Sequence, residues 1–347
     1  GFRRIGSLNS SDADMAMHIN SLNGNGSTVK LNMSFYRYGK DYDRYYNDIN
    51  INNTTSVDCK TGLGLFNNLI QSSDNENNTI SNLIISGHVD YEYYKDHSGK
   101  KNIIYENNSS FSCVGALAGV GSNLRLDKIQ LEKLSVNSCF VSGGIVGFAK
   151  KLVQIKDLKS DDLNVSANFF SGGIIGIAGN CNVKIDGSSD SEGLIRGSIT
   201  SGSISLVGDT SRGEGASLYG VGIGAATVIG AFLNTNNTVL TSLSVTNINI
   251  EDLDVSAPLI GRAMLGGIVG CCGNTTAKNI QSRIQNVDIK NVDINKEVKR
   301  FAFNGGIIGL VKEGVKKCEI SNVKIIGDKN NKNTITGYRH SGGIIGL

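Results

Sequence analysis

Apolar residues recur in two short patterns along most of the chain, and both favour β-strands. The first is a glycine-rich hexamer with an apolar pair in its middle, as in Ser171–Gly176. The second has the spacing Ile-x-x-Leu-x-Ile and ends in a short alternating stretch, as in Ile80–Ile85. Period-two runs of β-branched residues, bounded by Gly, Asn, Asp and Ser, are typical of strands rather than helices. We therefore expect an all-β structure from about residue 60 onward.

The hexamer occurs five times in nearly identical form, with weaker copies at Val114–Gly119 and Tyr219–Gly224 and an opening variant at Gly62–Phe66. The last glycines of successive copies are 28 to 48 residues apart, as in solenoid repeats. The expected repeat corners are the glycines of the five strong copies: Gly143, Gly144, Gly147, Gly172, Gly173, Gly176, Gly266, Gly267, Gly270, Gly305, Gly306, Gly309, Gly342, Gly343 and Gly346. The expected ladder, facing a core or a partner, is Ile145, Ile174, Ile175, Ile268, Ile307, Ile308, Ile344 and Ile345.

The second pattern also recurs, and its copies begin at Ile80, Leu131, Leu240, Ile284 and Ile320. One repeat of 28 or 29 residues has room for a glycine corner, two strands and a return segment. Such a repeat buries its apolar face only when it stacks on its neighbours, which predicts a parallel β-helix (β-solenoid) over residues 61–347. The composition agrees, since 44 Gly suit the corners and a single Pro leaves the strand ladder intact.

Two features of the hexamer need an explanation. Its glycine pair supplies either a positive φ or a close approach between repeats. Its two apolar residues are consecutive, and consecutive strand residues point to opposite faces. We therefore expect one of each pair, such as Ile174–Ile175, to face outward beneath another layer, an inserted loop or a partner chain.

Residues 1–60 differ from the repeats and contain one plausible helix, near Asp12–Leu22. We expect this segment to cap the first repeat, because an open strand edge promotes aggregation. At the other end the sequence stops within the hexamer Ser341–Gly346, so we expect the repeats to continue beyond the C-terminus.

The hexamers, together with Gly62–Phe66 and Ile80–Gly87, resemble the GLUG-type repeats of large microbial surface proteins. The lead-in from Ala13 to Met33 is similar to the segment that precedes such repeats, and the resemblance spans nearly the whole chain. It implies an extracellular, adhesin-like β-helical region, in some proteins attached to a separate peptidase. The seven cysteines and the uneven repeat lengths depart from the usual pattern.

Charge and hydropathy narrow the possible partners. With 34 Lys+Arg and 31 Asp+Glu, the formal charge of +3 provides little attraction for nucleic acid. No apolar run approaches the length of a membrane-spanning helix. The seven cysteines have no zinc-ligand spacing; we interpret them as small buried residues, with one or two disulfides as the alternative.

No catalytic, cofactor-binding or metal-binding residues are predicted. The four histidines include no HExxH pair, and the chain lacks a GxSxG elbow and a Walker-type loop. His88 and His97, with acidic residues between them, are interpreted as part of a solvated loop. The carboxylates that a carbohydrate-active β-helix would use are Asp157, Asp161, Asp162, Asp252 and Asp254.

The preferred function is therefore a non-enzymatic structural or adhesive scaffold at the cell surface or outside the cell. Its expected partners are proteins, glycans or copies of itself. The alternative is a carbohydrate-active enzyme, a lyase or a hydrolase, which would need two carboxylates facing one cleft. Ice or mineral binding is disfavoured, because a regular Thr-x-Thr series is missing.

Overall fold

Parallel strands form nearly all of the regular structure in the computed structural model, and every regular element among the described residues is a strand. The structure describes residues 16–38, 49–52, 56–59, 62–72, 77–94, 113–138, 141–167, 170–187, 193–201, 223–234, 238–256, 263–273, 279–294, 302–312, 314–327, 334–335 and 340–347. The all-β prediction is confirmed. Long parallel sheets of this kind are compatible with a β-helix.

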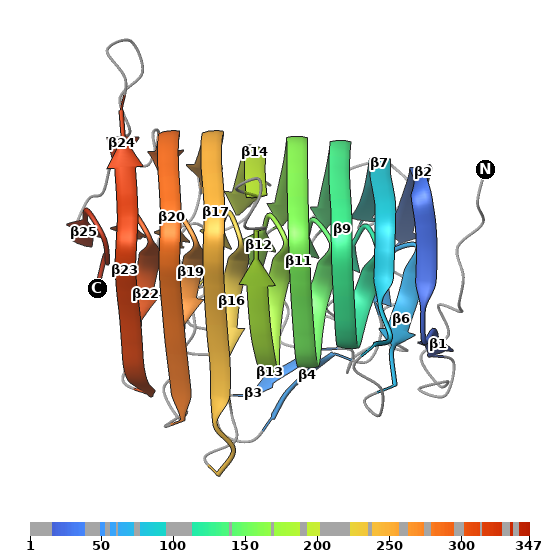
Figure 1. The fold of residues 1–347 in the computed structure, drawn as a ribbon, viewed down its shortest axis with the longest axis horizontal. Helices are drawn as coiled ribbons and strands as arrows, with labels where there is room; N and C mark the ends of the chain where they lie inside the picture. The colour runs from blue at the N-terminus through green and yellow to red at the C-terminus, as the bar shows by residue number, and fades with distance from the viewer. Residues whose placement is uncertain are drawn as a thin grey trace.

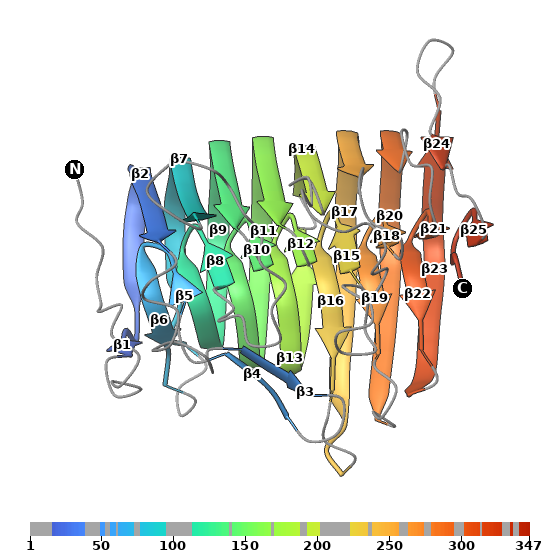
Figure 2. The same ribbon diagram turned by 180° about the vertical axis from the view of Figure 1, so that it is seen from behind.

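Eight short strands form one parallel sheet (Figure 2). Seven of them begin at, or just before, a copy of the glycine hexamer. In sheet order they are β5 (Gly62–Leu63), β8 (Cys113–Gly115), β10 (Val141–Gly143), β12 (Phe170–Gly172), β15 (Ile223–Ala226), β18 (Ala263–Gly266), β21 (Ala302–Gly305) and β25 (His340–Gly342).

A second, 15-stranded sheet holds the longer strands, which stand side by side from β2 to β23 in Figure 1. A separate antiparallel pair is formed by β3 (Ile49–Asn52) and β4 (Ser56–Cys59). Strand β4 lies against β13 (Ile175–Asp186) of the large sheet. The strands of the large sheet are β1 (Met17–His18), β2 (Leu22–Tyr38), β6 (Phe66–Ile70), β7 (Ile80–Tyr94), β9 (Ala118–Ser138), β11 (Val146–Ala167), β13 (Ile175–Asp186), β14 (Gly193–Ser201), β16 (Ile229–Leu233), β17 (Thr241–Ser256), β19 (Val269–Cys272), β20 (Ile280–Ile294), β22 (Ile308–Val311), β23 (Val315–Ile326) and β24 (Thr334–Ile335).

We define a unit as one short strand together with the large-sheet strands that follow it along the chain, up to the next short strand. Inward side chains of successive units stack in register and form one continuous apolar core. One such column runs through six strands of the large sheet, and all of its members are at most 2% exposed: Ile80, Leu126, Ile155, Ile185, Val245 and Ile284. Burying an aliphatic side chain of this size contributes roughly 1.5–3 kcal/mol, so each column is a large stabilising term.

Corner residues with positive φ divide the long strands at repeated register positions. Their φ values lie between +46° and +61°, a region that Asn and Asp tolerate better than most residues. Corner A consists of Asn123, Lys151 and Asn180; corner B of Asn25, Asn82, Lys128, Asp157, Asn247, Asn286 and Asn322; corner C of Lys133, Asp162, Asp252 and Asn291.

These corners explain the Ile-x-x-Leu-x-Ile spacing. Between Ile284 and Val287, both Gln285 and the corner residue Asn286 are at least partly exposed, and the flanking apolar residues are buried. The left-handed residue interrupts the alternation of inward and outward side chains, so that two consecutive residues face outward. Apolar positions three residues apart therefore face the same core. The copy assigned to Leu240 is wrong in phase: Leu240 is 47% exposed, and the residues at the equivalent register positions begin at Val245.

The helix expected near Asp12–Leu22 is wrong for its described part. From residue 16 onward the chain forms β1 and β2, which pair in parallel with β6 and β7. Leu31 and Met33 enter the common core. Residues 16–38 therefore extend the stack of strands instead of forming a helical segment, while residues 12–15 lie outside the described residues.

Both apolar residues of a hexamer face the same core, which corrects the expectation that one of them faces outward. Ile174 and Ile175 are fully buried in the main cluster, as are Ile307 and Ile308. The reason is that the second glycine and the first isoleucine form the bend between two strands, so the pair is not continuous strand. In the last hexamer Ile344 and Ile345 are 42% and 37% exposed.

Most hexamer glycines are required for close approach and not for positive φ, Gly343 being an exception. Among the described glycines, positive φ occurs only at Gly26, Gly87 and Gly273, which lie outside the hexamers. A Cβ on Gly172 would lie 1.8 Å from the carbonyl oxygen of Ile175 in the same bend. A Cβ on Gly306 would lie 2.1 Å from the carbonyl oxygen of Gly343 in the next unit. Backbone atoms therefore exclude side chains at these corners.

Candidate binding faces

The outward side chains of the long strands form three faces, separated by the corners. The first face lies between corners A and B, the second between corners B and C, and the third beyond corner C. Because the strands pair in register, each face repeats the same positions from unit to unit. Adjacent strands lie about 4.8 Å apart, so each face presents regularly spaced rows of side chains.

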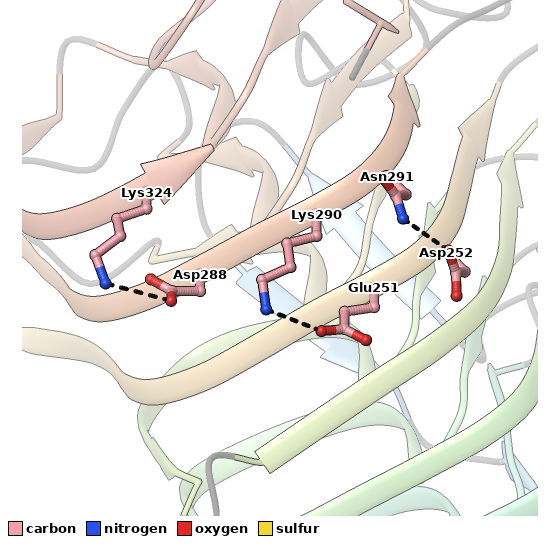
Figure 3. Close-up of polar contacts among 6 residues, drawn as sticks. All are labelled: Glu251, Asp252, Asp288, Lys290, Asn291 and Lys324. Carbon is pink, nitrogen blue, oxygen red and sulfur yellow. Dashed lines mark hydrogen bonds and ion pairs between the residues drawn. The ribbon is translucent and has the colours of Figure 1, made fainter. Parts of the chain in front are cut away.

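The first and second faces carry charges of both signs. On the second face Lys290 Nζ lies 3.2 Å from Glu251 Oε1, and Lys324 Nζ lies 3.4 Å from Asp288 Oδ2 (Figure 3). Each pair joins neighbouring strands. The first face also has basic side chains, such as Lys184 and Arg283 at paired positions on either side of Ser244.

The third face has a different composition: none of its outward register positions among the described residues holds Lys or Arg. Lys133 lies at corner C, on the rim of the face. The outward positions whose side chains are described are Asn32, Ser34, His88, Asp90, Ser135, Asn137, Asn164, Ser166, Asp254, Ser256, Asp293 and Thr334.

Hydrogen bonds connect several of these side chains across units. Asn137 Nδ2 donates to Asp90 Oδ1 over 2.6 Å, and Ser166 Oγ donates to Asn137 Oδ1 over 2.5 Å. Asn137 Nδ2 also lies 3.1 Å from Ser135 Oγ. On the neighbouring units His88 Nε2 lies 3.4 Å from Ser34 Oγ. Polar side chains of the third face are therefore linked between neighbouring strands from β2 to β11.

Amide side chains form a second ladder at corner B. Asn247 Nδ2 donates to Asp186 Oδ1 over 2.8 Å, Asn286 donates to Asn247 over 2.9 Å, and Asn322 donates to Asn286 over 2.7 Å. At corner C, Asn291 Nδ2 donates to Asp252 Oδ1 over 3.2 Å (Figure 3). These bonds link units along the edges of the faces.

The five carboxylates considered for catalysis do not all lie on one face. Asp157 lies at corner B, and Asp162 and Asp252 lie at corner C, where their positive φ gives them a backbone role. Asp161 points outward on the second face and Asp254 on the third, on opposite sides of corner C. Among the described residues no three His, Cys, Asp or Glu side chains gather as a metal site would require.

The described histidines do not form a pair. His18 is exposed in β1, His88 lies on the third face, and the ring of His340 stacks on Phe303 with centroids 5.1 Å apart. His97 lies outside the described residues.

Cys113, Cys181, Cys271, Cys272 and Cys318 are free thiols, while the side chains of Cys59 and Cys139 are outside the described part. Burial raises the pKa of the Cys271 thiol to about 12, an effect that Lys312 partly opposes. Burial also raises the pKa of Cys181 and of Cys272 well above the usual value. These three are poor nucleophiles at neutral pH and agree with the prediction of small buried residues.

No family model, no curated protein and no solved structure matches the chain. None of the described residues belongs to an apolar helix long enough to cross a membrane.

Proposed function

We propose that the chain is a parallel β-solenoid that acts as a non-enzymatic structural or adhesive scaffold outside the cell, with β1 and β2 of the N-terminal segment covering the edge of its first repeat. The observation that best supports this is the register: side chains at equivalent positions recur on each outward face along the stack. Repeats that contact only their neighbours make a stiff, extended binding surface. The resemblance to GLUG-type surface proteins points to the same role.

Partners in this proposal are proteins, glycans or further copies of the chain. The carbohydrate-active alternative is less favoured, because the five candidate carboxylates are distributed over two corners and two faces. Acid–base cleavage of a glycosidic bond needs two carboxyl groups within about 5–10 Å across the substrate.

A direct test is to incubate the purified chain with a panel of polysaccharides and to measure both retention on each polymer and release of soluble products. We expect retention on some polymers and no more product than with heat-denatured protein. Product release that disappears in Asp161→Asn or Asp254→Asn would overturn the non-enzymatic assignment in favour of a hydrolase or lyase.

The extracellular location has its own test, antibody labelling of intact, unpermeabilised cells of the source organism. Surface labelling is expected. Labelling only after permeabilisation would contradict the proposed location.

A further inference from the structure

The third face presents hydrogen-bonding groups over several successive units, without a lysine or arginine among its described outward positions. Asn32, Ser34 and Asn164 are exposed, and Ser135 and Asn137 are partly exposed. The first and second faces carry lysines and arginines at comparable positions, such as Arg283 and Lys290. The third face therefore differs in composition from the first and second faces.

The strands that carry this face are anchored in the core by their inward side chains. Each outward residue alternates with an inward one, and Val89, Val136 and Val165 are at most 1% exposed in the core. The hydrogen bonds from Ser166 to Asn137 and from Asn137 to Asp90 fix the outward side chains relative to one another. A partner that binds here meets groups already in place, which lowers the entropic cost of binding.

The chemistry of the face selects among polymers. Amide and hydroxyl groups both donate and accept hydrogen bonds, as sugar hydroxyls do, and carboxylates accept them. Anionic polymers are normally recognised by Arg and Lys, which this face lacks, and they would meet Asp254 and Asp293. The carboxylate of Asp90 is already bonded to Asn137, which reduces its attraction for a cationic polymer.

The geometry favours an extended partner. Rows on neighbouring strands are about 4.8 Å apart, and outward residues of one strand are about 7 Å apart, so contacts repeat along the stack. The described outward residues of this face lie side by side on parallel strands. A polymer with repeating hydroxyls gains affinity by adding many weak contacts.

We propose that the third face binds an extended, uncharged polysaccharide that lies across successive units. This inference rests on the proposed scaffold function. It adds which face of the scaffold binds a partner and which class of partner binds there.

The test uses the full chain in sedimentation assays with four polymers: cellulose and chitin as uncharged probes, carboxymethyl-cellulose beads as the anionic probe and chitosan as the cationic probe. The variant Asn164→Arg places a bulky charge among the outward residues of the third face. Gln285→Arg is the matched control, since it changes a partly exposed outward amide of the first face in the same way.

We expect wild-type chain to bind cellulose or chitin, Asn164→Arg to bind at least about tenfold more weakly, and Gln285→Arg to bind within about twofold of wild type. If Asn164→Arg does not fold, as judged by circular dichroism, Ser135→Arg on the adjacent strand replaces it.

Binding to neither uncharged polymer would overturn the inference, as would binding only to the charged polymers or equal binding by both variants. Any of these results leaves the scaffold function standing, because that function is overturned by product release and not by loss of polysaccharide binding.

Discussion

At the scale of single residues, hexamer glycines that look equivalent in sequence differ in what surrounds them. A Cβ on Gly306 would meet the backbone of the next unit, whereas a Cβ on Gly343 would meet nothing within 4 Å. Gly306→Ala should therefore lower the free energy of unfolding by about 1–3 kcal/mol, as expected for overpacking against rigid backbone. Gly343→Ala is the control and should stay within about 0.5 kcal/mol of wild type. Equal midpoints in urea unfolding would contradict this reading.

Asn286 combines a left-handed backbone with two ladder bonds. Its φ is +55°, and it donates to Asn247 and accepts from Asn322. Asn286→Gly and Asn286→Val both remove these bonds, but only glycine adopts the backbone conformation freely. The valine variant should be less stable than the glycine variant by about 1–2 kcal/mol. The comparison is made by thermal unfolding, and a valine variant as stable as the glycine variant would refute the role of φ.

The buried thiols predict a loss of stability at alkaline pH. The pKa of Cys271 is raised from 9.0 to about 12 by burial, so above pH 9 the unfolded chain loses this proton while the folded chain keeps it. The contribution of Cys271 is complete below pH 9 and is lost as the pH rises toward 12. Cys271→Val should reduce the slope of unfolding free energy against pH in this window. An unchanged slope would show that Cys271 does not titrate as its burial implies.

At the scale of strands, ion pairs between neighbours add little. The side chains of Lys290 and Glu251 are 40% and 23% exposed, and solvent screens such a pair. Lys290→Ala should lower stability by about 0.2–1 kcal/mol at low salt and by less at high salt. Lys316→Ala, at an exposed position on β23, is the control. A salt-independent loss of several kcal/mol would mean that Lys290 acts mainly through packing.

The strands were predictable because apolar periodicity records which side chains are buried. Ile284, Val287 and Ile289 were identified from their spacing, and all three are in the core. The corner at Asn286 was not identified, since the sign of φ leaves no trace in hydrophobicity; an Asn, Asp or Lys before the second apolar residue was the available signal. Without the corners, the copies at Leu131 and Leu240 are each five residues out of register: the positions equivalent to Ile80 and Ile284 are Leu126 and Val245.

For a related reason, the sequence alone could not show whether the candidate carboxylates lie on the same face. Which outward positions share a face depends on the corners and on the register between strands. Asp161 and Asp162 are adjacent in sequence, yet one lies on the second face and the other at a corner. The third face was missed because its defining property, the lack of cations, becomes visible only after register assigns residues from several strands to one surface.

At the scale of the molecule, stability should vary along the stack. The inward residues Leu126, Ile129 and Leu131 of β9 are at most 2% exposed, whereas Ile320 and Val323 of β23 are only partly buried. Hydrogen exchange followed by mass spectrometry should find the slowest amides in β9 and β11 and faster exchange in β23. Uniform protection across these strands would indicate a single cooperative unit and contradict a repeat-by-repeat architecture.

The side-chain ladders all point the same way along the molecule. In each run that begins at Asp90, Asp186 or Asp252, the donor belongs to the later unit and the acceptor to the earlier one. Aspartate has no hydrogen to donate, so it can start such a run but cannot pass it on to a preceding unit, while asparagine does both. The outer side chains therefore restrict the order of the units as well as the core does. An aspartate moved into the middle of a run would have no hydrogen to donate to the unit before it, so each run has a direction along the stack that its individual strands, taken alone, do not specify.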